Sequence, residues 1–514
     1  MNINRRSFLL GSAAATALAG CATSKTGARE LKPGEKRRIA MIGYGIQMRT
    51  ALLPQFLGEN DECKELRNTV EVVAVCDCDR VRAAAGAKQV NDAYKTNNCV
   101  AVHDFRKVLE DPMIDAVCIG APDHWHAYMS VEAMKHGKDV YCEKPLTFSI
   151  EEAKKVIEAQ EKYDRVFQTG SMQRSWREFR DAVALVRGGL IGDVMYVDAN
   201  YGIGGKKLGG PSHPLRFFDV PENAATEGAP NPDVDWDMWL GPAQWRPYSD
   251  QLAPRGVNNF YPMFWRFDDD IGSGYNGDWG AHHLDIAQWG LDMDKSGPFR
   301  IVRSDEPYST DLFHGGRRQF GMKMLFAKSY GTVELYHGPF GVWGTVFYGT
   351  KGIVAVNRGK IAVWLGGKSA GVKPDAEVRA ALQNAENLFA KENVVVESIG
   401  KDYGTDAMVK KDNKLASALD KIEKDFADVI EKAGLYVSTN QVKNFCECLE
   451  TRKRTISPAE VGGRGATLCL LCNTSYKYDT GFDWDPVNME IAGCNRKGIS
   501  IKREKYRAGW DITV

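Results

Sequence analysis

The strongest constraint on the fold is a regular alternation of short apolar segments and helical patterns between residues 37 and 170. Apolar runs rich in β-branched residues occur at 37–43, 70–77, 113–121, 138–144 and 166–171, and helical patterns separate most of them. Parallel strands need a long crossover connection, usually a helix, whereas antiparallel strands need only a short turn. The pattern therefore predicts a parallel sheet with helices on both faces, the doubly wound α/β architecture.

Beyond residue 171 the pattern changes to strands that follow one another through turns. Candidate strands at 192–201, 318–327, 331–338, 343–349 and 360–366 predict an α+β C-terminal domain (171–514) with an open, largely antiparallel sheet. Residues 203–270 are rich in Gly, Pro and Trp, and we expect them to form a pocket wall. The charged, helical pattern at 372–436 predicts a solvated helical insertion.

The first 21 residues have the pattern of an export signal. Arg5-Arg6-Ser7-Phe8-Leu9 resembles a twin-arginine signal, and Leu18-Ala19-Gly20-Cys21 resembles a lipoprotein cleavage box. The apolar stretch between them is too short to cross a bilayer core of ~30 Å. We expect residues 1–21 to be a signal, 22–36 a linker, and the protein to be a periplasmic or cell-envelope lipoprotein anchored through Cys21. An ordinary cleaved signal is the alternative.

Charge and cysteine content exclude some classes of function. Lys plus Arg and Asp plus Glu are both 67, so there is no net field that would hold a nucleic acid. Cys446-x-Cys448 and Cys469-x-x-Cys472 fall in helical patterns without glycine-rich knuckles, which disfavours a zinc site, and we expect no metal.

A glycine-rich turn follows the first predicted strand. In Gly43-Tyr44-Gly45-Ile46-Gln47-Met48, the first glycine permits a tight turn and the second permits close approach of a pyrophosphate to the backbone. Met48 stands where this type of turn usually has a third glycine, and Pro54 should bend the helix that follows.

An acidic residue ends the second predicted strand. A carboxylate at Asp77 accepts hydrogen bonds from ribose hydroxyls and repels a 2′-phosphate, which favours NAD. NADP stays an alternative because Arg80 and Arg82 follow closely.

Candidate catalytic groups lie in three separate stretches. Pro122-Asp123-His124-Trp125-His126 follows one strand and Glu143-Lys144-Pro145 follows the next, so both should lie at the ligand-binding edge of the sheet. Far downstream, Asp278, His282 and Asp285 are spaced to share one face of a helix.

These motifs together resemble the glucose–fructose oxidoreductase, inositol dehydrogenase and rhizopine-catabolism (Gfo/Idh/MocA) family from about residue 38 to the end. The resemblance implies a Rossmann NAD(P)-binding domain (37–170), a C-terminal substrate domain, and Lys144, Asp278 and His282 as the catalytic trio. The chain departs from the family pattern at Met48 and at Ala121, where many members have threonine. The predicted cofactor-binding residues are Gly43, Tyr44, Gly45, Ile46, Gln47, Asp77, Pro122, His124, Glu143 and Lys144, and the predicted substrate-binding residues are Gln173, Arg174 and Asp285.

The predicted roles of the trio follow from charge. Oxidation of a secondary alcohol requires the hydroxyl proton to leave, and His282 is assigned as its acceptor. Lys144 donates to the reacting oxygen, and Asp278 orients His282 or binds a neighbouring hydroxyl.

The export signal adds an expectation about the cofactor. An exported NAD enzyme has no nicotinamide pool outside the cytoplasm, so its cofactor should be tightly bound and recycled within the site. We therefore predict an NAD(P)-dependent oxidoreductase that acts on a sugar. One alternative is an NAD-dependent glycoside hydrolase or lyase that works by transient C3 oxidation and elimination. The other is a non-catalytic sugar-binding lipoprotein. A homo-oligomer stays open, because the broad sheets of such second domains often pair.

Overall fold

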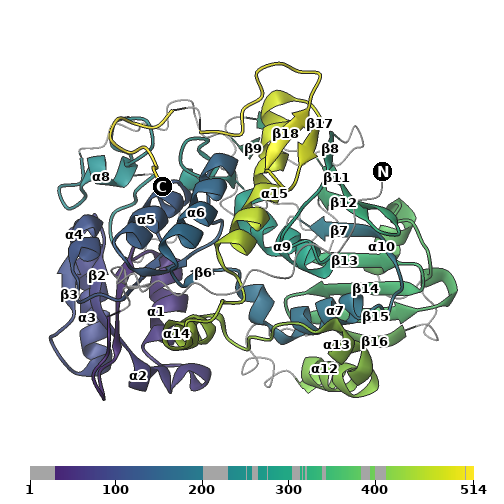
Figure 1. Cartoon of the computed structure of the whole chain (residues 1–514), viewed down its shortest axis with the longest axis horizontal. Coiled ribbons are helices and arrows are strands. Elements are labelled where there is room, and N and C mark those ends of the chain that lie inside the picture. The colour runs from purple at the N-terminus through teal and green to yellow at the C-terminus, as the bar shows by residue number, and fades with distance from the viewer. Residues whose placement is uncertain are drawn as a thin grey trace, which may run out of the picture.

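The computed structural model of the chain contains two packed domains (Figure 1). It describes residues 29–200, 230–250, 252–257, 264–274, 276–303, 313–314, 317–318, 321–338, 343–383, 394–399, 413–503 and 505–514. The predicted signal, with Cys21, lies outside the described residues, as do parts of the predicted loop 203–270.

The first domain contains the predicted parallel sheet. Its strands lie in the order β3-β2-β1-β4-β5-β6, and every neighbouring pair is parallel. This order is that of the doubly wound dinucleotide-binding fold. The strands are β1 (Arg37–Ile42), β2 (Val70–Cys76), β3 (Val100–Val102), β4 (Ala116–Ile119), β5 (Asp139–Cys142) and β6 (Phe167–Thr169).

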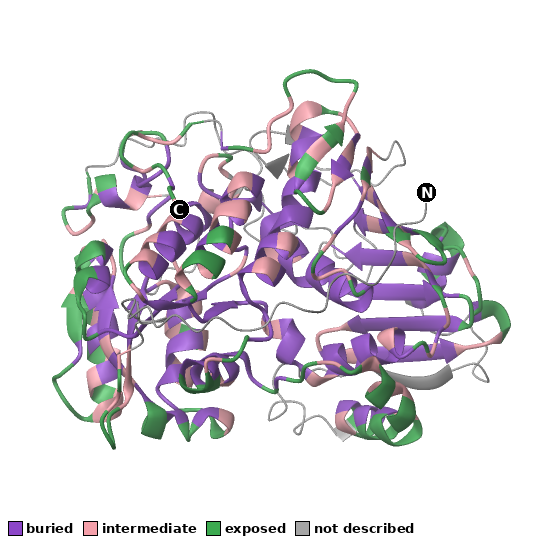
Figure 2. Cartoon of the chain, viewed as in Figure 1, coloured by how far each residue is buried: buried purple, intermediate pink, exposed green. Residues whose placement is uncertain are grey.

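Helices cover both faces of this sheet, and its strands are largely buried between them (Figure 2). The buried side chains that pack between the layers form two apolar clusters. The helices are α1 (Leu53–Phe56), α2 (Leu66–Thr69), α3 (Arg80–Tyr94), α4 (Phe105–Glu110), α5 (Asp123–Lys135) and α6 (Ile150–Tyr163). The helix after β1 starts as a π-helical turn, η1 (Met48–Leu52), before α1. Pro54 lies in the first turn of α1 and lacks the N–H that a continuous α-helix needs there, which accounts for the predicted irregularity.

The second domain is built on a ten-stranded sheet, among the residues described. Its order is β16-β15-β14-β13-β7-β12-β11-β8-β17-β18, and only β7 and β12 pair in parallel, which confirms the largely antiparallel prediction. The strands are β7 (Val194–Asn200), β8 (Arg300–Arg303), β11 (Met322–Lys328), β12 (Gly331–Gly338), β13 (Thr345–Gly349), β14 (Gly352–Asn357), β15 (Lys360–Leu365), β16 (Val394–Ile399), β17 (Phe482–Asp485) and β18 (Glu490–Gly493). A separate pair is formed by β9 (Phe313–His314) and β10 (Arg317–Arg318).

Helices α7 (Arg177–Arg187), α9 (Ala281–Gly290) and α15 (Ala459–Tyr478) pack on this sheet and enclose the main core of the second domain. The prediction of a solvated helical insertion at 372–436 is wrong in part. The segment contains α10 (Ala376–Gln383), α12 (Asn413–Asp425) and α13 (Ala427–Ala433), but its β16 pairs with β15 and extends the sheet. In addition, Leu415, Leu419 and Ile422 of α12 are buried in the core.

Later parts of the chain return to the first domain. Helix α14 (Gln441–Thr451) packs into its core through Phe445, α15 packs along α6, and α8 (Trp236–Leu240) lies near β2 through a bridge between Asp79 and Val234. Trp510, near the end of the chain, packs on Trp125 of α5. The two domains therefore share a long seam.

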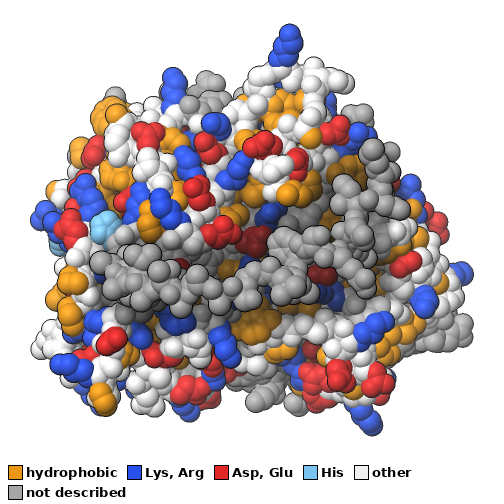
Figure 3. Space-filling model, in the orientation of Figure 1, with side chains coloured by type: hydrophobic (Ala, Val, Ile, Leu, Met, Phe, Trp, Pro, Cys, Tyr) orange, Lys and Arg blue, Asp and Glu red, His pale blue; other side chains and the backbone are white. Residues whose placement is uncertain are grey.

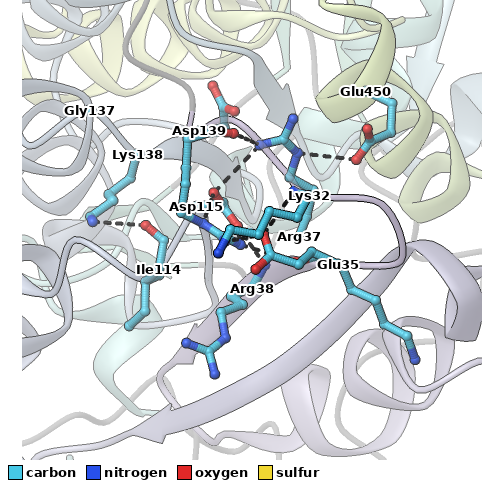
Figure 4. Close-up of polar contacts among 12 residues, drawn as sticks. Lys32, Glu35, Arg37, Arg38, Ile114, Asp115, Gly137, Lys138, Asp139 and Glu450 are labelled. Carbon is cyan, nitrogen blue, oxygen red and sulfur yellow. Dashed lines mark hydrogen bonds and ion pairs between the residues drawn. The ribbon is translucent and has the colours of Figure 1, made fainter.

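The end of the predicted linker 22–36 is docked on the first domain rather than free. Arg29 Nη2 lies 3.0 Å from Asp115 Oδ2, and the same carboxylate accepts the backbone N–H of Arg38. Arg37 donates to Glu450 of α14, as Figure 4 shows. These contacts lie at the edge of the sheet opposite its carboxyl ends.

Within the described residues, no helix is both long and apolar enough to cross a membrane. On the described part of the face in Figure 3, acidic and basic side chains are interspersed. The eleven described cysteines are unpaired thiols, and Cys446 and Cys469 lie in the cores of different domains.

Candidate active site

A cavity of about 260 Å³ lies at the carboxyl ends of the parallel strands, where the doubly wound fold places its ligands. The loops after β1, β2, β4 and β5 form one wall, and residues of the second domain and of the predicted aromatic loop form the other. Of the predicted site residues, those that line it are Gly43, Gly45, Ile46, Gln47, Asp77, Pro122, Glu143, Lys144 and Asp278.

The glycine turn has the backbone geometry that the sequence predicts. Gly43 has φ +86°, and a Cβ there would lie 2.8 Å from the backbone nitrogen of Ala121, so only glycine fits. A Cβ on Gly45 would meet no atom closer than 4.0 Å, which leaves space beside the turn. Met48 is accommodated by a different glycine, because its Cε lies 3.2 Å from the Cβ position of Gly120.

Asp77 follows β2 directly and faces the cavity. Its carboxylate accepts the backbone N–H groups of Tyr44 at 2.7 Å and Asp79 at 2.9 Å, which fixes its orientation. Burial raises the pKa of Asp77, and these donors with Arg82 offset the shift only in part. Arg82 also lines the cavity, whereas Arg80 is exposed.

Lys144 and Asp278 form an ion pair at the junction of the two domains. Lys144 Nζ lies 2.7 Å from Asp278 Oδ1 and also donates to the backbone carbonyl of Asp278. Arg266 approaches the other carboxylate oxygen at 3.4 Å. Burial alone would raise the pKa of Asp278, but the two cations reverse this and lower it, so the carboxylate stays ionised.

Glu143, the residue before Lys144, is buried and lines the same cavity. It accepts hydrogen bonds from Gln47 Nε2 and from the backbone N–H of Lys144. A Cβ on Gly170, the residue after β6, would lie 2.7 Å from the Glu143 carboxylate, so the glycine leaves room for it. Burial raises the pKa of Glu143, and Lys144 opposes that shift. Glu143 thus links the glycine turn to the backbone of Lys144.

The expected helix face of Asp278, His282 and Asp285 is interrupted. Asp278 lies in a π-helical turn, η5 (Asn276–Gly280), and α9 starts at Ala281. The wider turn breaks the 3.6-residue spacing on which the prediction depends. Asp278 therefore reaches Lys144, while Asp285 points away toward Arg174.

His282 is buried in the first turn of α9 and is not among the residues that line the cavity. Its Nδ1 has no hydrogen-bond partner among the described residues, and its ring meets that of Trp279 at 5.8 Å, edge to face. Burial, with the nearby charges of Lys144 and Arg358, lowers the pKa of His282 well below 6.5. The imidazole is therefore neutral at physiological pH.

Two of the predicted substrate-binding residues have a different role in the structure. Arg174 is buried and binds Asp285 at 2.8 Å through two nitrogens, and also Asp294 at 2.8 Å. The charges of Arg174 and Asp285 are thus neutralised inside the protein and are not available to a substrate. Gln173 accepts a hydrogen bond from Arg358 at 3.2 Å, and its role in substrate binding stays a prediction.

Two predicted cofactor-binding side chains also turn away from the cavity. The ring of Tyr44 packs in the core against Gly86, so only its backbone takes part in the turn. His124 Nε2 contacts the Trp239 carbonyl oxygen at 3.2 Å, and burial lowers its pKa to about 3. His126 does line the cavity and lies between the carbonyl oxygens of Pro145 and Ala121.

The sequence did not reveal several residues of the site. Arg266 pairs with Asp278 and lines the cavity beside Trp265, and Trp239 and Leu252 also belong to the wall. All four lie in the aromatic loop that was expected to form a pocket wall, so only their general region was predicted. Arg358 stacks on Trp176 at 5.2 Å and Trp279 at 4.7 Å, and no motif in the sequence marks it.

The residues around the cavity fit a nicotinamide dinucleotide. The turn at Gly43 lacks the Cβ atoms that would block a pyrophosphate, and Asp77 stands at the strand end where a ribose binds in this fold. Lys144 and Asp278 mark the opposite end of the same cavity, where the reactive ring would meet a substrate.

Comparisons with known proteins agree with this geometry. Residues 37–171 match the NAD-binding Rossmann fold model of the Gfo/Idh/MocA oxidoreductase family, and 214–321 match its C-terminal alpha/beta domain model. A glycosyl hydrolase family 109 protein of Stenotrophomonas maltophilia is 30% identical over 248 residues, 47% of this chain and 48% of that protein. The scyllo-inositol 2-dehydrogenase (NAD(+)) of Bacillus subtilis is 40% identical over 93 residues, 18% of this chain and 27% of that enzyme. The aligned segments thus span less than half the length of these relatives.

The solved structure of an oxidoreductase domain protein from Kribbella flavida shares the fold. Its TM-score is 0.51 at 17% identity, with 87% of this chain and 99% of that chain covered. The two domain models of the Gfo/Idh/MocA oxidoreductase family thus match this chain in the order in which its two domains occur.

Proposed function

We propose that this protein oxidises a secondary hydroxyl of a sugar or sugar derivative, with NAD as its cofactor. The observation that supports the proposal best is the Lys144–Asp278 ion pair, whose two residues line the dinucleotide cavity. The neutral imidazole of His282 lies close enough to Lys144 for the lysine charge to lower its pKa. The loop after β1 would hold the pyrophosphate, Asp77 the adenosine ribose, and Glu143 the loop that presents Lys144.

The charges of this site assign a separate role to each of the three proposed catalytic residues. When bound, the dinucleotide supplies the hydride acceptor for the carbon that is oxidised. The Lys144 ammonium donates a hydrogen bond to the reacting oxygen and stabilises negative charge as it develops. The neutral imidazole of His282 takes the hydroxyl proton, and Asp278 holds the Lys144 ammonium in place through its 2.7 Å contact.

We also propose that the protein is exported through the twin-arginine route and anchored by a lipid on Cys21. The support is the sequence Arg5-Arg6-Ser7-Phe8-Leu9 and the later Leu18-Ala19-Gly20-Cys21. The cofactor would be bound during folding in the cytoplasm, before export, and would then be recycled by a second half-reaction in the same site.

A second candidate is a redox-neutral glycoside hydrolase. It is favoured by the match to a family 109 glycosyl hydrolase, which covers more of this chain than the match to the inositol dehydrogenase. Oxidation at C3 of a glycoside acidifies the C2 proton, which permits elimination of the leaving group, water addition and re-reduction. The same Lys144 and His282 would serve both reactions.

The test begins with the full chain, expressed with its N-terminal segment. Denaturation and mass spectrometry of the supernatant should release near-stoichiometric NAD or NADH. Sugars are then screened for a change in nicotinamide absorbance, and aryl glycosides for release of the aglycone. Release without net NADH selects the hydrolase, and a lasting absorbance change selects the oxidoreductase. A chain that neither releases nor binds the cofactor would refute both.

A further inference from the structure

One wall of the dinucleotide cavity is formed by a segment that lies outside the first domain in sequence and is bonded to it in space. We call residues 230–250 and 252–257 the strap. The strap residues that line the cavity are Val234, Met238, Trp239, Leu252, Ala253 and Pro254. The loops after β1, β2, β4 and β5 line the same cavity from the first domain. A dinucleotide that fills the cavity is therefore bounded by the first domain and by the strap.

The start of the strap is bonded to the first domain through backbone groups. The Arg80 N–H donates to the Asp233 carbonyl oxygen at 2.8 Å, and the Asp235 N–H donates to the Cys78 carbonyl oxygen at 3.0 Å. An antiparallel bridge joins the same two stretches between these bonds. Since Asp77 directly precedes this stretch, the strap is fastened beside the residue that is proposed to hold the adenosine ribose.

Two further hydrogen bonds fasten the middle and the end of the strap. The Trp239 carbonyl oxygen accepts the indole N–H of Trp125 at 3.0 Å. The Pro254 carbonyl oxygen accepts a hydrogen bond from Arg82 Nη2 at 3.1 Å. All four residues line the cavity, so the strap and the first domain meet at the cavity itself.

The C-terminal tail fastens the strap at positions that do not line the cavity. The Arg507 guanidinium donates to the carboxylate and the carbonyl oxygen of Asp237, each at 2.6 Å, and to the Gly241 carbonyl oxygen at 2.9 Å. The Arg507 backbone N–H donates to the Pro242 carbonyl oxygen at 3.1 Å. None of these four described residues lines the cavity, so a change at Arg507 alters the strap without removing a contact to a bound dinucleotide.

Contacts within the strap make it stiff. The rings of Trp236 and Trp239 stack with their centroids 4.8 Å apart, and Tyr248 packs edge to face on Trp236 at 5.1 Å. The Tyr248 hydroxyl lies 2.9 Å from the Ala253 carbonyl oxygen, which joins the helical part of the strap to its end. We therefore expect the strap to open as one unit, with its bonds to the first domain and to the tail breaking together.

We propose that the strap retains the dinucleotide, so that NAD stays in the site through many turnovers instead of exchanging at each one. This inference rests on the proposed function, because it takes the dinucleotide as the occupant of the cavity. The Arg80 N–H and the Arg507 side chain act as positioning groups, because they hold the strap in place and neither belongs to the cavity lining. Their loss should therefore speed exchange of the cofactor.

Exchange of the bound cofactor in the purified holoprotein tests the proposal. The full chain is incubated with an excess of deuterium-labelled cofactor in the redox state found in the purified protein. The unlabelled cofactor that stays bound is then measured by mass spectrometry after desalting and denaturation. We expect the wild-type protein to keep most of its unlabelled cofactor for hours.

Arg80→Pro removes one backbone bond of the strap. Arg80 is the first residue of α3, where proline is tolerated because this N–H has no partner within the helix. The preceding residue has φ −90° and ψ 115°, a conformation that proline permits. We expect exchange to be about tenfold faster in this variant. The control Arg80→Ala loses the same exposed side chain but keeps the N–H, and it should exchange at the wild-type rate.

Arg507→Ala tests the strap from the tail. It removes three hydrogen bonds to the strap and should also speed exchange by about tenfold or more. The matched control is Arg496→Ala, since Arg496 is an exposed arginine that donates to the Tyr478 carbonyl oxygen instead of to the strap. This control should exchange at the wild-type rate.

The outcomes separate this inference from the proposed function. A holoprotein in which Arg80→Pro and Arg507→Ala both exchange at the wild-type rate would overturn the inference alone. The same holds if Arg80→Ala is as fast as Arg80→Pro, or if the wild-type protein exchanges completely within the time of mixing. A purified chain that neither contains nor binds the dinucleotide would overturn the proposed function and this inference with it.

Discussion

Replacement of His337 by Asn should remove a defined part of the acid sensitivity of this protein. His337 lies in β12, where its Nδ1 contacts the Ala199 carbonyl oxygen at 2.8 Å and its Nε2 contacts Asn276 at 3.3 Å. Asn276 starts the π-helical turn that carries Asp278, so His337 contacts the turn that positions Asp278. Burial lowers the pKa of His337 to about 4, and asparagine keeps an N–H donor near Ala199 without a titrating group.

The sign and size of the effect follow from proton linkage. Histidine in an unfolded chain titrates near pH 6.5. Between pH 6.5 and about 4 the unfolded state holds a proton that the folded state does not, so His337 destabilises the fold as the pH falls. At pH 5 this amounts to about 2 kcal/mol, and at pH 7.5 it is close to zero.

Urea unfolding of wild type and His337→Asn, followed by tryptophan fluorescence, measures this contribution. Any packing cost of the substitution is present at every pH and cancels in the comparison. The difference in free energy of unfolding between the two proteins should shift by about 2 kcal/mol in favour of the variant from pH 7.5 to pH 5. It should stay constant from pH 7.5 to pH 9. An equal difference at pH 5 and pH 7.5 would show that His337 is not held neutral by the fold.

Three further predictions concern the site and its support. Gly43→Ala places a Cβ 2.8 Å from a backbone nitrogen, so the purified variant should release little or no NAD on denaturation while its circular dichroism is preserved. His282→Gln should keep the bound cofactor but lower kcat by roughly 10²–10⁴, as single-turnover kinetics will show. Because the pKa of His282 is lowered, the wild-type rate should not fall between pH 8 and 6.5 through protonation of this group. Arg174→Met leaves Asp285 and Asp294 without their partner and should cost about 3–5 kcal/mol in urea unfolding, whereas adding Asp285→Asn should restore part of the loss.

The sequence predicted the first domain better than the second because its signals are local. The strand that ends in Cys76 and the acidic residue after it are visible as an apolar run and a charge, and the structure places both as expected. The turn at Gly43 depends on backbone angles that only glycine adopts, so its residue type is informative by itself. In contrast, β16 adds to the sheet only because β15 is available as a partner, and its sequence lies within a stretch that otherwise has a helical pattern.

The predictions for the site residues show the same difference between local signals and contacts that depend on distant segments. Lys144 and Asp278 were identified from motifs, but their contact joins residues 134 positions apart and depends on how the two domains pack. Arg174 and Asp285 have the polarity of substrate-binding residues in the sequence, and only the fold shows that they bind each other over 111 positions. Helical spacing placed Asp285 beside Asp278, and the π-helical turn at Asn276–Gly280 separated them.

What the sequence determined alone is the series of strands and helices, the glycine turn and the acid after β2, because backbone preference and hydrophobic periodicity act over a few neighbouring residues. What only the tertiary structure decided is which charges face the cavity and which neutralise each other. Coulomb and hydrogen-bond energies depend on distance and burial in space, and distant segments acquire both only when they pack together.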